Sequence, residues 1–360
     1  MTDDFVLIKS NEAIAAAALR AGCRFYAGYP ITPQSEILEY MSTHMEKVGG
    51  TFIQGENELA SISMVWGAAG AGALAMTSSS GPGYSLMQEG ISYLASYNLP
   101  AVLVCANRQG SGDGDITPSQ ECYNLVTRGG GHGDHRQMVF APASVQEAAD
   151  LTYRAFEVAQ KYRNICIVLT DSAISQMIEK CVLPPAKEHD INSVEWAITG
   201  KPRGVKKNRV TNLEREIGFN EYVELQRKNF HEMYQNEQRW EAVQTEDAEI
   251  ILVAYGISSR VCKSAVTEAR AKGMKLGLIR PITLWPYPDK AFEQISESVK
   301  AFCTVEMNLS SLMCHDVVNA CRHQWPVYSC ATAYDIPTVE RILACCADIF
   351  AGRKAEVEVL

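Results

Sequence analysis

A single carboxylate and a glycine–proline turn are separated by one strand–helix–strand stretch in the N-terminal half of the sequence. Glu58 falls in the first turn of an expected helix, which follows a strand expected over residues 51–54. A second strand, expected over 73–76, leads into the turn at 80–83 (Ser-Gly-Pro-Gly). Open parallel α/β sheets bind ligands where their strands end. The carboxylate and the turn are therefore expected to face one crevice.

Each feature has an ordinary structural explanation, and only the combination favours a functional site. A glutamate in the first turn of a helix is usually a partner of the helix dipole. Gly-Pro-Gly alone is a common turn. The spacing between Glu58 and residues 80–83, with a strand, helix and strand between them, makes the functional interpretation the better one.

Two other expected strand ends carry polar side chains that could bind a substrate. In the segment Tyr29-Pro30-Ile31-Thr32-Pro33, two prolines fix the backbone around Thr32, which could equally be a helix N-cap. A buried strand over 101–106 brings Arg108 to the same edge of the sheet. Arginine is a natural partner for a carboxylate, although an exposed loop arginine is the ordinary alternative.

The composition excludes several classes of protein. The chain has 360 residues, a net charge of −9 and a pI near 5.4, which argues for two domains and against nucleic-acid binding. No apolar run approaches the roughly 20 residues that span a bilayer, so no membrane association is expected. The acidic N-terminus lacks a signal-peptide pattern, and we expect a cytoplasmic protein.

The cysteine and histidine spacings do not indicate a metal site. Twelve cysteines include no C-x-x-C pair, and several lie in apolar strands, where a free thiol acts as a small hydrophobe. An iron–sulfur cluster is therefore not expected in this chain. The stretch RGGGHGDHR at 128–136 lacks closing ligands, so a mobile or interface loop is the better interpretation.

The pattern of apolar runs predicts an α/β protein with a parallel sheet and a second, smaller α/β domain. We expect the first domain at 1–185, a charged linker with a long helix at 186–246, and the second domain at 247–360. The linker includes a basic connector, GKPRGVKKNR at 200–209, before the helix, and could reach across a partner subunit. A packing or assembly role is expected for the second domain.

Five motifs together resemble the α subunit of 2-oxoacid:ferredoxin oxidoreductases. They are YPITP at 29–33, GENELA at 55–60, TSSSGPG at 77–83, ANR at 106–108 and LIRPITLWP at 278–286. The resemblance covers both domains and most of the linker, and it is closest to the branched-chain (2-oxoisovalerate, or 3-methyl-2-oxobutanoate) members with four subunits. It implies a pyrimidine-binding domain of the thiamin diphosphate type followed by a transketolase-C-terminal-like domain.

The resemblance also implies roles for particular residues. Glu58 matches the glutamate that contacts N1′ of the thiamin pyrimidine, and Thr32 and Arg108 match the residues that receive the oxo and carboxylate groups of the substrate. The further residues expected at the cofactor are Tyr29, Pro30, Ile31, Ser80, Gly81 and Pro82. The stretch at 329–338, SCATAYDIPT, lacks the glycine run often found there in the family.

The rest of the cofactor site is expected in partner chains. Gly112-Asp113-Gly114 resembles half of a diphosphate and magnesium motif, but the window at 137–142 lacks the asparagine that completes it. The resemblance therefore implies a β subunit that binds diphosphate and Mg²⁺, a γ subunit, and a ferredoxin-like subunit that carries iron–sulfur clusters.

The implied reaction is oxidative decarboxylation of a 2-oxoacid to acyl-CoA and CO2, with coenzyme A as acceptor and ferredoxin reduced, a chemistry typical of anaerobic metabolism. Asp113 and Asp115, with no Lys or Arg before Arg128, favour an apolar branched-chain substrate over 2-oxoglutarate or pyruvate. A non-catalytic scaffold subunit is the alternative from another class. A dinucleotide-binding protein is a third, although the glycines at 67–72 lie near a helix end and not directly after a strand.

Overall fold

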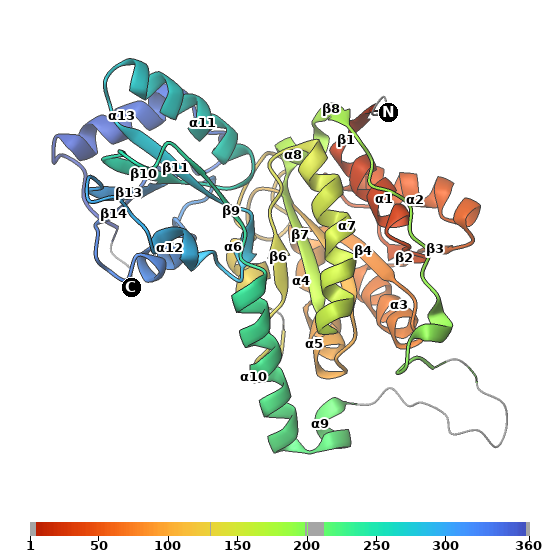
Figure 1. Cartoon of the computed structure of the whole chain (residues 1–360). Helices are drawn as coiled ribbons and strands as arrows, with labels where there is room; N and C mark the ends of the chain where they lie inside the picture. Colours follow the sequence, from red (N-terminus) through yellow and green to blue (C-terminus); the bar gives the residue numbers. More distant parts are fainter. Residues whose placement is uncertain (1–4, 130, 199, 201–211, 358–360) are drawn as a thin grey trace.

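The computed structural model describes residues 5–129, 131–198, 200 and 212–357, which form two α/β units beside one another (Figure 1). The described residues include a seven-stranded sheet, a five-stranded sheet and a two-stranded sheet. The α/β class expected from the sequence, with mostly parallel sheets, is confirmed. No helix among these residues has the combination of length and apolar character that crossing a membrane requires.

The larger sheet forms the first unit and is parallel except at one edge. Its order is β12 (Thr283–Trp285), β6 (Met138–Phe140), β7 (Ile165–Asp171), β5 (Ala101–Asn107), β4 (Ala75–Ser80), β2 (Phe25–Gly28) and β3 (Thr51–Gln54). Only β12 is antiparallel to its neighbour, and it comes from the C-terminal part of the chain. All residues of β4, β5 and β7 are buried, as expected for a parallel sheet covered on both faces.

Alternate residues of the central strands pack into separate cores on the two faces. Val102 and Val104 of β5 belong to the core that includes α1 (Ser10–Arg20), α2 (Ser35–His44) and α7 (Val145–Tyr162). Leu103 and Cys105 pack against α3 (Glu58–Gly70) and α5 (Gln88–Ser96) on the other face. Because β2 to β7 all run parallel, their carboxyl ends lie along one edge of the sheet, where the candidate residues lie.

The smaller sheet forms the second unit. Its order is β14 (Val327–Ser329), β13 (Ala301–Thr304), β10 (Ile250–Val253), β11 (Leu276–Pro281) and β9 (Trp240–Val243), and only β9 is antiparallel. Helices α11 (Gly256–Ala271) and α13 (Val339–Phe350) pack together on one face, and α12 (Cys314–Ala320) follows β13.

Several local predictions need correction. The turn expected at 80–83 is the end of β4 and the first turn of α4 (Gly81–Leu86), because proline is accommodated at the start of a helix. The residue pattern at 84–97 predicts a single helix, but the chain forms two helices there, α4 and α5. The residues after Pro288 also predict a helix, but they form only a 3₁₀ turn, Asp289–Phe292.

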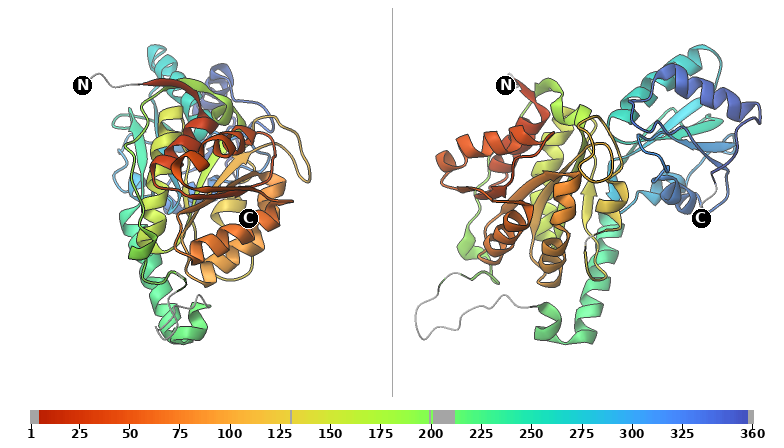
Figure 2. Two further views of the ribbon diagram at one scale, coloured as in Figure 1. Left: turned by 90° about the vertical axis from the view of Figure 1, so that its right-hand side faces the viewer. Right: turned by 180° about the vertical axis from the view of Figure 1, so that it is seen from behind.

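The linker is part of the second unit as well as a connector. Helices α9 (Leu213–Ile217) and α10 (Phe219–Asn236) form an arm along the outside of the molecule (Figures 1 and 2). The long helix expected through residue 243 ends at Asn236, and β9 follows it. Residues 201–209 of the basic connector lie outside the described part of the chain.

The remaining elements complete the first unit. They are β1 (Val6–Lys9) paired with β8 (Ile178–Cys181), α6 (Tyr123–Thr127), α8 (Ser172–Gln176), and the 3₁₀ turns Glu46–Val48 and Ile191–Ser193.

Candidate active site

Glu58 is the first residue of α3, and only 4% of its surface is exposed. The helix begins here because Asn57 Oδ1 accepts a hydrogen bond from the backbone N–H of Ala60, at 2.8 Å. Ser79 Oγ donates to Glu58 Oε1 at 3.2 Å. Among the described residues no hydrogen bond reaches Glu58 Oε2, so this buried carboxylate keeps an acceptor for a group from outside the chain.

Gly83 provides the space that the Glu58 carboxylate occupies. A Cβ at position 83 would overlap both Glu58 Oε1 and Ser79 Oγ. The end of β4 and the start of α4 therefore approach α3 as closely as they do because residue 83 has no side chain. Gly83 is a site residue that the sequence analysis missed, although it lies in the motif that was singled out.

A chain of buried hydrogen bonds holds the segment that carries Thr32. Tyr26 Oη donates to Ser78 Oγ at 2.6 Å, and Ser78 Oγ donates to Gln34 Oε1 at 2.5 Å. Gln34 Nε2 then donates to the carbonyl oxygen of Tyr29 at 3.1 Å. All three side chains, of Tyr26, Ser78 and Gln34, are fully buried. Their network therefore holds the 29–33 segment to strands β2 and β4. Sequence reasoning did not identify any of these three residues.

Thr32 and Arg108 lie beside each other, as expected from the two strand ends. Arg108 Nη1 donates to the carbonyl oxygen of Thr32 at 3.2 Å, and Arg108 Nη2 donates to that of Asp113 at 2.5 Å. Arg108 is half-buried, and its Nε is buried without a hydrogen-bond partner in the described chain. The guanidinium is thus held by two neutral carbonyls in a place where it can also meet an anion.

The other predicted residues lie around these two groups. Ser80 is fully buried, and its Oγ has no hydrogen-bond partner within the described regions. Gly81, Pro82 and Ile31 are half-buried, whereas Tyr29 and Pro30 are exposed. No hydrogen bond between described residues joins the Glu58 group directly to the Thr32–Arg108 group.

The Gly112-Asp113-Gly114 segment behaves as a loop. Gly112 and Gly114 have φ of +67° and +62°, and a Cβ at Gly114 would overlap the carbonyl oxygen of Gln109. These glycines are therefore required by the backbone itself. Across the described parts of the chain, no group of three or more His, Cys, Asp or Glu side chains is placed to hold a metal ion.

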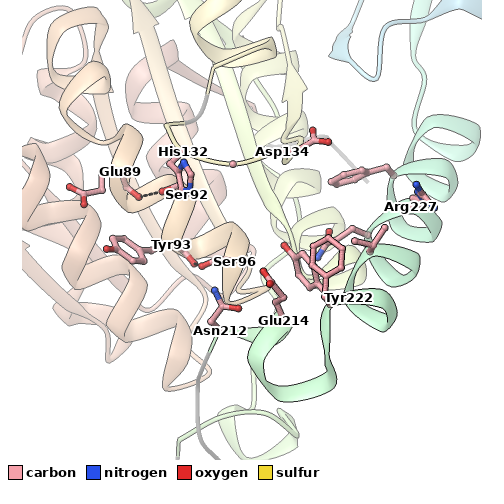
Figure 3. Close-up of a pocket in the computed structure, with 15 residues that line it drawn as sticks. Glu89, Ser92, Tyr93, Ser96, His132, Asp134, Asn212, Glu214, Tyr222 and Arg227 are labelled. Atoms are coloured by element: carbon pink, nitrogen blue, oxygen red, sulfur yellow. Dashed lines mark hydrogen bonds between the residues drawn. The ribbon is translucent and has the colours of Figure 1, made fainter.

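Two cavities are lined by residues singled out in the sequence: His132 of the loop at 128–136 in one, and Thr32 in the other. One, of about 800 Å³, separates α5 from the α9–α10 arm and is lined by His132, Tyr93, Tyr222 and Arg227 (Figure 3). Its lining includes none of the predicted site residues. The other, of about 450 Å³, is lined by Thr32, Pro33, Ile116 and Ser172, among others. The chemistry therefore points to the sheet edge at Glu58 and Thr32, and not to the larger cavity.

Comparisons with known proteins agree on one family. Residues 16–248 match the family described as "Pyruvate flavodoxin/ferredoxin oxidoreductase, thiamine diP-bdg", and residues 248–335 match "Pyruvate:ferredoxin oxidoreductase core domain II". The ketoisovalerate oxidoreductase subunit VorB of Methanothermobacter marburgensis is 48% identical over 324 residues, which cover 88% of this chain and 90% of that protein. The 2-oxoglutarate synthase subunit KorA of Methanocaldococcus jannaschii is 36% identical over 338 residues, covering 88% and 91%.

Solved structures show the same fold at lower identity. The 2-oxoglutarate:ferredoxin oxidoreductase from Magnetococcus marinus, with 2-oxoglutarate, coenzyme A and succinyl-CoA bound, has a TM-score of 0.84 at 24% identity. The match covers 96% of this chain and 65% of that one. A split-gene transketolase, described as an inactive β4 tetramer, has a TM-score of 0.60 at 13% identity, with 96% and 99% covered.

The pyrimidine-binding type of first unit and the transketolase-like architecture expected from the motifs are both confirmed. With its family matches and its relatives along most of its length, this chain belongs to the thiamin diphosphate-binding 2-oxoacid:ferredoxin oxidoreductases, as a subunit of the α type.

Proposed function

We propose that this chain is the α subunit of a CoA-acylating oxidoreductase that converts a branched-chain 2-oxoacid, such as 2-oxoisovalerate, to acyl-CoA and CO2 while ferredoxin is reduced. The observation that carries the proposal is the buried Glu58 carboxylate, with a free acceptor oxygen beside a glycine that makes room for it. The 48% identity to a ketoisovalerate oxidoreductase subunit supports the substrate class.

The residues at the end of β4 fit the pyrimidine side of thiamin diphosphate. Ser80 Oγ is buried without a hydrogen-bond partner in the described chain, and no described residue donates to Glu58 Oε2. A heterocycle with ring nitrogens and an amino group would satisfy both atoms. When bound, the cofactor supplies the electron sink for decarboxylation. Glu58 would accept a hydrogen bond at N1′ of the pyrimidine and hold the proton there, because a carboxylate is an acceptor of matched basicity.

Arg108 and Thr32 would position the substrate. Charge-assisted bonds from a guanidinium to a carboxylate are stronger than its bonds to the neutral carbonyls of Thr32 and Asp113. A substrate carboxylate would therefore replace these carbonyls. The Thr32 hydroxyl, which is exposed beside Arg108, would donate to the oxo oxygen and orient the acid.

The surroundings of Thr32 favour an apolar substrate side chain. The cavity beside Thr32 is lined by Ile116, Pro118 and Ala173 and contains one carboxylate, that of Glu36, but no Lys or Arg. A second substrate carboxylate, as in 2-oxoglutarate, would have no cationic partner in this lining. Pyruvate and 2-oxoglutarate are the alternative substrates.

Partner chains would complete the active site. We propose a β subunit for diphosphate and Mg²⁺, a γ subunit, and a ferredoxin-like subunit for the iron–sulfur clusters that accept electrons, with the complex in the cytoplasm. The twelve cysteines of this chain are buried free thiols, and none belongs to a metal-binding group in its described residues. The divisions at residues 185 and 246 remain our proposed domain limits.

The assembled complex tests this proposal through Glu58→Gln, with the exposed neighbour Glu56→Gln as matched control. Turnover of 2-oxoisovalerate should fall by about 10² to 10⁴-fold in Glu58→Gln, as for loss of a proton-holding group, and stay normal in the control. Near-normal activity of Glu58→Gln would favour the scaffold alternative. Faster turnover of 2-oxoglutarate than of 2-oxoisovalerate by the unmodified complex would overturn the substrate assignment alone.

A further inference from the structure

The second unit concentrates thiols in one of its two cores. Five of the twelve cysteines belong to the core between the smaller sheet and helices α11 and α13: Cys262, Cys303, Cys330, Cys345 and Cys346. A buried cysteine ordinarily acts as a small hydrophobe. Two of these five, Cys303 and Cys345, also contact each other through their sulfur atoms.

Cys345 lies at the centre of this thiol group. It is on α13, and its Sγ is 4.0 Å from Sγ of Cys303 on β13. Cys330, which follows β14, belongs to the same core, and its Sγ donates to the carbonyl oxygen of Arg341 at 4.0 Å. When protonated, Cys345 can donate to the carbonyl oxygen of Ser329, at 3.9 Å.

Cys345 also differs from its neighbours in charge environment and access. It is 9% exposed, whereas Cys303 is fully buried. The neighbouring Cys303 thiol holds the pKa of Cys345 below the ordinary thiol range, and the positive charge of Lys354 acts in the same direction. Burial instead raises the pKa of Cys346 to about 12. Cys345 is therefore the thiol of the Cys303–Cys345 pair that a solute can reach, and its lowered pKa favours the thiolate, which is the nucleophilic form.

We infer that Cys345 and Cys303 form an oxidation site, in which Cys345 reacts with a hydroperoxide and Cys303 then closes a disulfide between α13 and β13. The Cys345 thiolate attacks one peroxide oxygen, the O–O bond breaks, and a sulfenic acid and hydroxide form. The Cys303 sulfur then attacks the Cys345 sulfur, and the hydroxyl group leaves as water with the Cys303 proton. In sum, two thiols and one hydrogen peroxide give one disulfide and two waters.

The geometry requires a small movement. The sulfur atoms must approach from 4.0 Å to about 2.05 Å, the length of a disulfide bond. Both side chains belong to the same packed core and their sulfur atoms already contact each other, so the bond needs the sulfurs to approach by about 2 Å. The closed bond would fix the C-terminal helix to the sheet on which it packs.

Residue-specific mass spectrometry of the full chain in its complex tests this inference. The complex is treated with stoichiometric hydrogen peroxide, quenched with N-ethylmaleimide under denaturing conditions and digested. We expect a Cys303–Cys345 crosslinked peptide that dithiothreitol abolishes. Loss of alkylatable Cys345 should be at least tenfold faster than loss of Cys23, which is buried and has no thiol neighbour among its hydrogen bonds.

Two variants and a control separate the steps. Cys303→Ser should leave a sulfenic acid at Cys345 that dimedone traps, and Cys345→Ser should leave Cys303 unoxidised. Cys23→Ser should form the crosslink at the normal rate. Equal oxidation rates at Cys345 and Cys23 would overturn the inference, as would a crosslink of Cys345 to Cys330 in place of Cys303. The oxidation rates and the crosslink can both be measured in the unmodified chain.

Discussion

Two neighbours fix the position of the Glu58 carboxylate: Ser79 donates a hydrogen bond to it, and Gly83 has no side chain that would overlap it. Its carboxylate has one hydrogen-bond donor, Ser79, and fills the space left by the missing side chain of Gly83. A buried carboxylate with few donors has a strong tendency to bind whatever donor approaches it. The position of Glu58 therefore depends on the turn after β4, and the proposed chemistry depends on the position of Glu58.

Gly83→Ala should therefore impair catalysis without removing any functional group. The added methyl would force the Glu58 carboxylate out of its place, and we expect turnover to fall by about 10²-fold, as for comparable misplacements of reacting groups. Steady-state turnover of the complex provides the measurement. Gly90→Ala is the matched control, because its Cβ would instead overlap Ile62 in the core. Gly90→Ala should lower thermal stability while its folded fraction keeps normal turnover; equal turnover losses in both variants would contradict this account.

The sequence identified the residues that could act, but not those that support them. Glu58, Thr32 and Arg108 follow strand ends, and strand ends can be recognised from apolar runs. Gln34 and Ser78 could not be found this way, because their importance depends on a hydrogen bond between residues 44 positions apart. Gly83 could have been included, since it is the second glycine of the same turn.

At the level of secondary structure, α3 is apolar on both its buried and its exposed sides. No charged side chain occurs from residue 59 to residue 87. Leu59 and Leu86 are 45% and 55% exposed, and Trp66 stacks on the partly exposed Tyr93 with ring centroids 4.8 Å apart. An exposed apolar patch beside a candidate site is typical of an interface with another chain. We therefore expect the partner subunit to cover the exposed side of α3.

Leu59→Lys should weaken assembly, because the interface would then have to bury an unpaired ammonium group. We expect at least a tenfold loss of partner subunits that co-purify with the tagged chain, quantified by densitometry. Ile178→Lys on β8 introduces the same charge at a 54% exposed position on the two-stranded sheet, and should assemble normally. Full assembly of Leu59→Lys would show that α3 faces solvent in the complex.

The sequence predicted parallel strands better than antiparallel ones. The strands expected at 51–54 and 101–106 appear as β3 and β5, and both pair in parallel within the larger sheet. The short edge strands β9 and β12 were missed. Their pairing is antiparallel and brings together segments far apart in the chain, so no local pattern indicates it.

Across the whole molecule, a few buried polar side chains join the two units. Gln120 donates to the carbonyl oxygen of Tyr255 at 2.9 Å and accepts from the backbone N–H of Met307 at 3.1 Å. Asp171, at the end of β7, accepts from the backbone N–H of Ile257 at 2.9 Å, at the start of α11. These contacts set the angle at which the second unit lies against the first (Figure 2).

The junction should make stability depend on pH through Asp171. Burial raises the pKa of Asp171 from 3.8 to about 6, although backbone N–H groups partly offset it. The folded state therefore binds this proton more tightly, so the contribution of Asp171 is fully present below pH 4 and is lost as the pH rises to 6. From pH 4 to 6, the free energy of unfolding of the wild type should fall by roughly 2 kcal/mol relative to that of Asp171→Asn, because the wild type loses the contribution of the bound proton. Denaturant titrations at each pH measure this, with the exposed Asp115→Asn as control; identical slopes in all three proteins would contradict it.

Arg280 forms a buried ionic contact between the units. It is 2% exposed, and its Nη1 and Nη2 donate to both carboxylate oxygens of Glu147 on α7, at 2.9 and 2.6 Å. Its Nε also donates to Glu241 at 2.8 Å. Arg280→Met would leave Glu147 without its ion-pair partner, whereas Glu241 would keep Lys263 at 2.8 Å, and the change should lower the free energy of unfolding by about 3 kcal/mol. Replacing the exposed Arg353, which pairs with Asp348, should change it by less than about 1 kcal/mol. Equal losses in the two variants would show that the junction does not depend on Arg280.

The position of Glu58 relative to the bound cofactor is the most direct test of the whole account. A structure of the assembled complex with thiamin diphosphate would measure the distance between the Glu58 carboxylate and N1′ of the pyrimidine. We predict about 2.6–3.0 Å, the range of a hydrogen bond, with the diphosphate held by the partner subunit. A carboxylate turned toward solvent, or a pyrimidine bound away from the β4–α4 turn, would contradict the account.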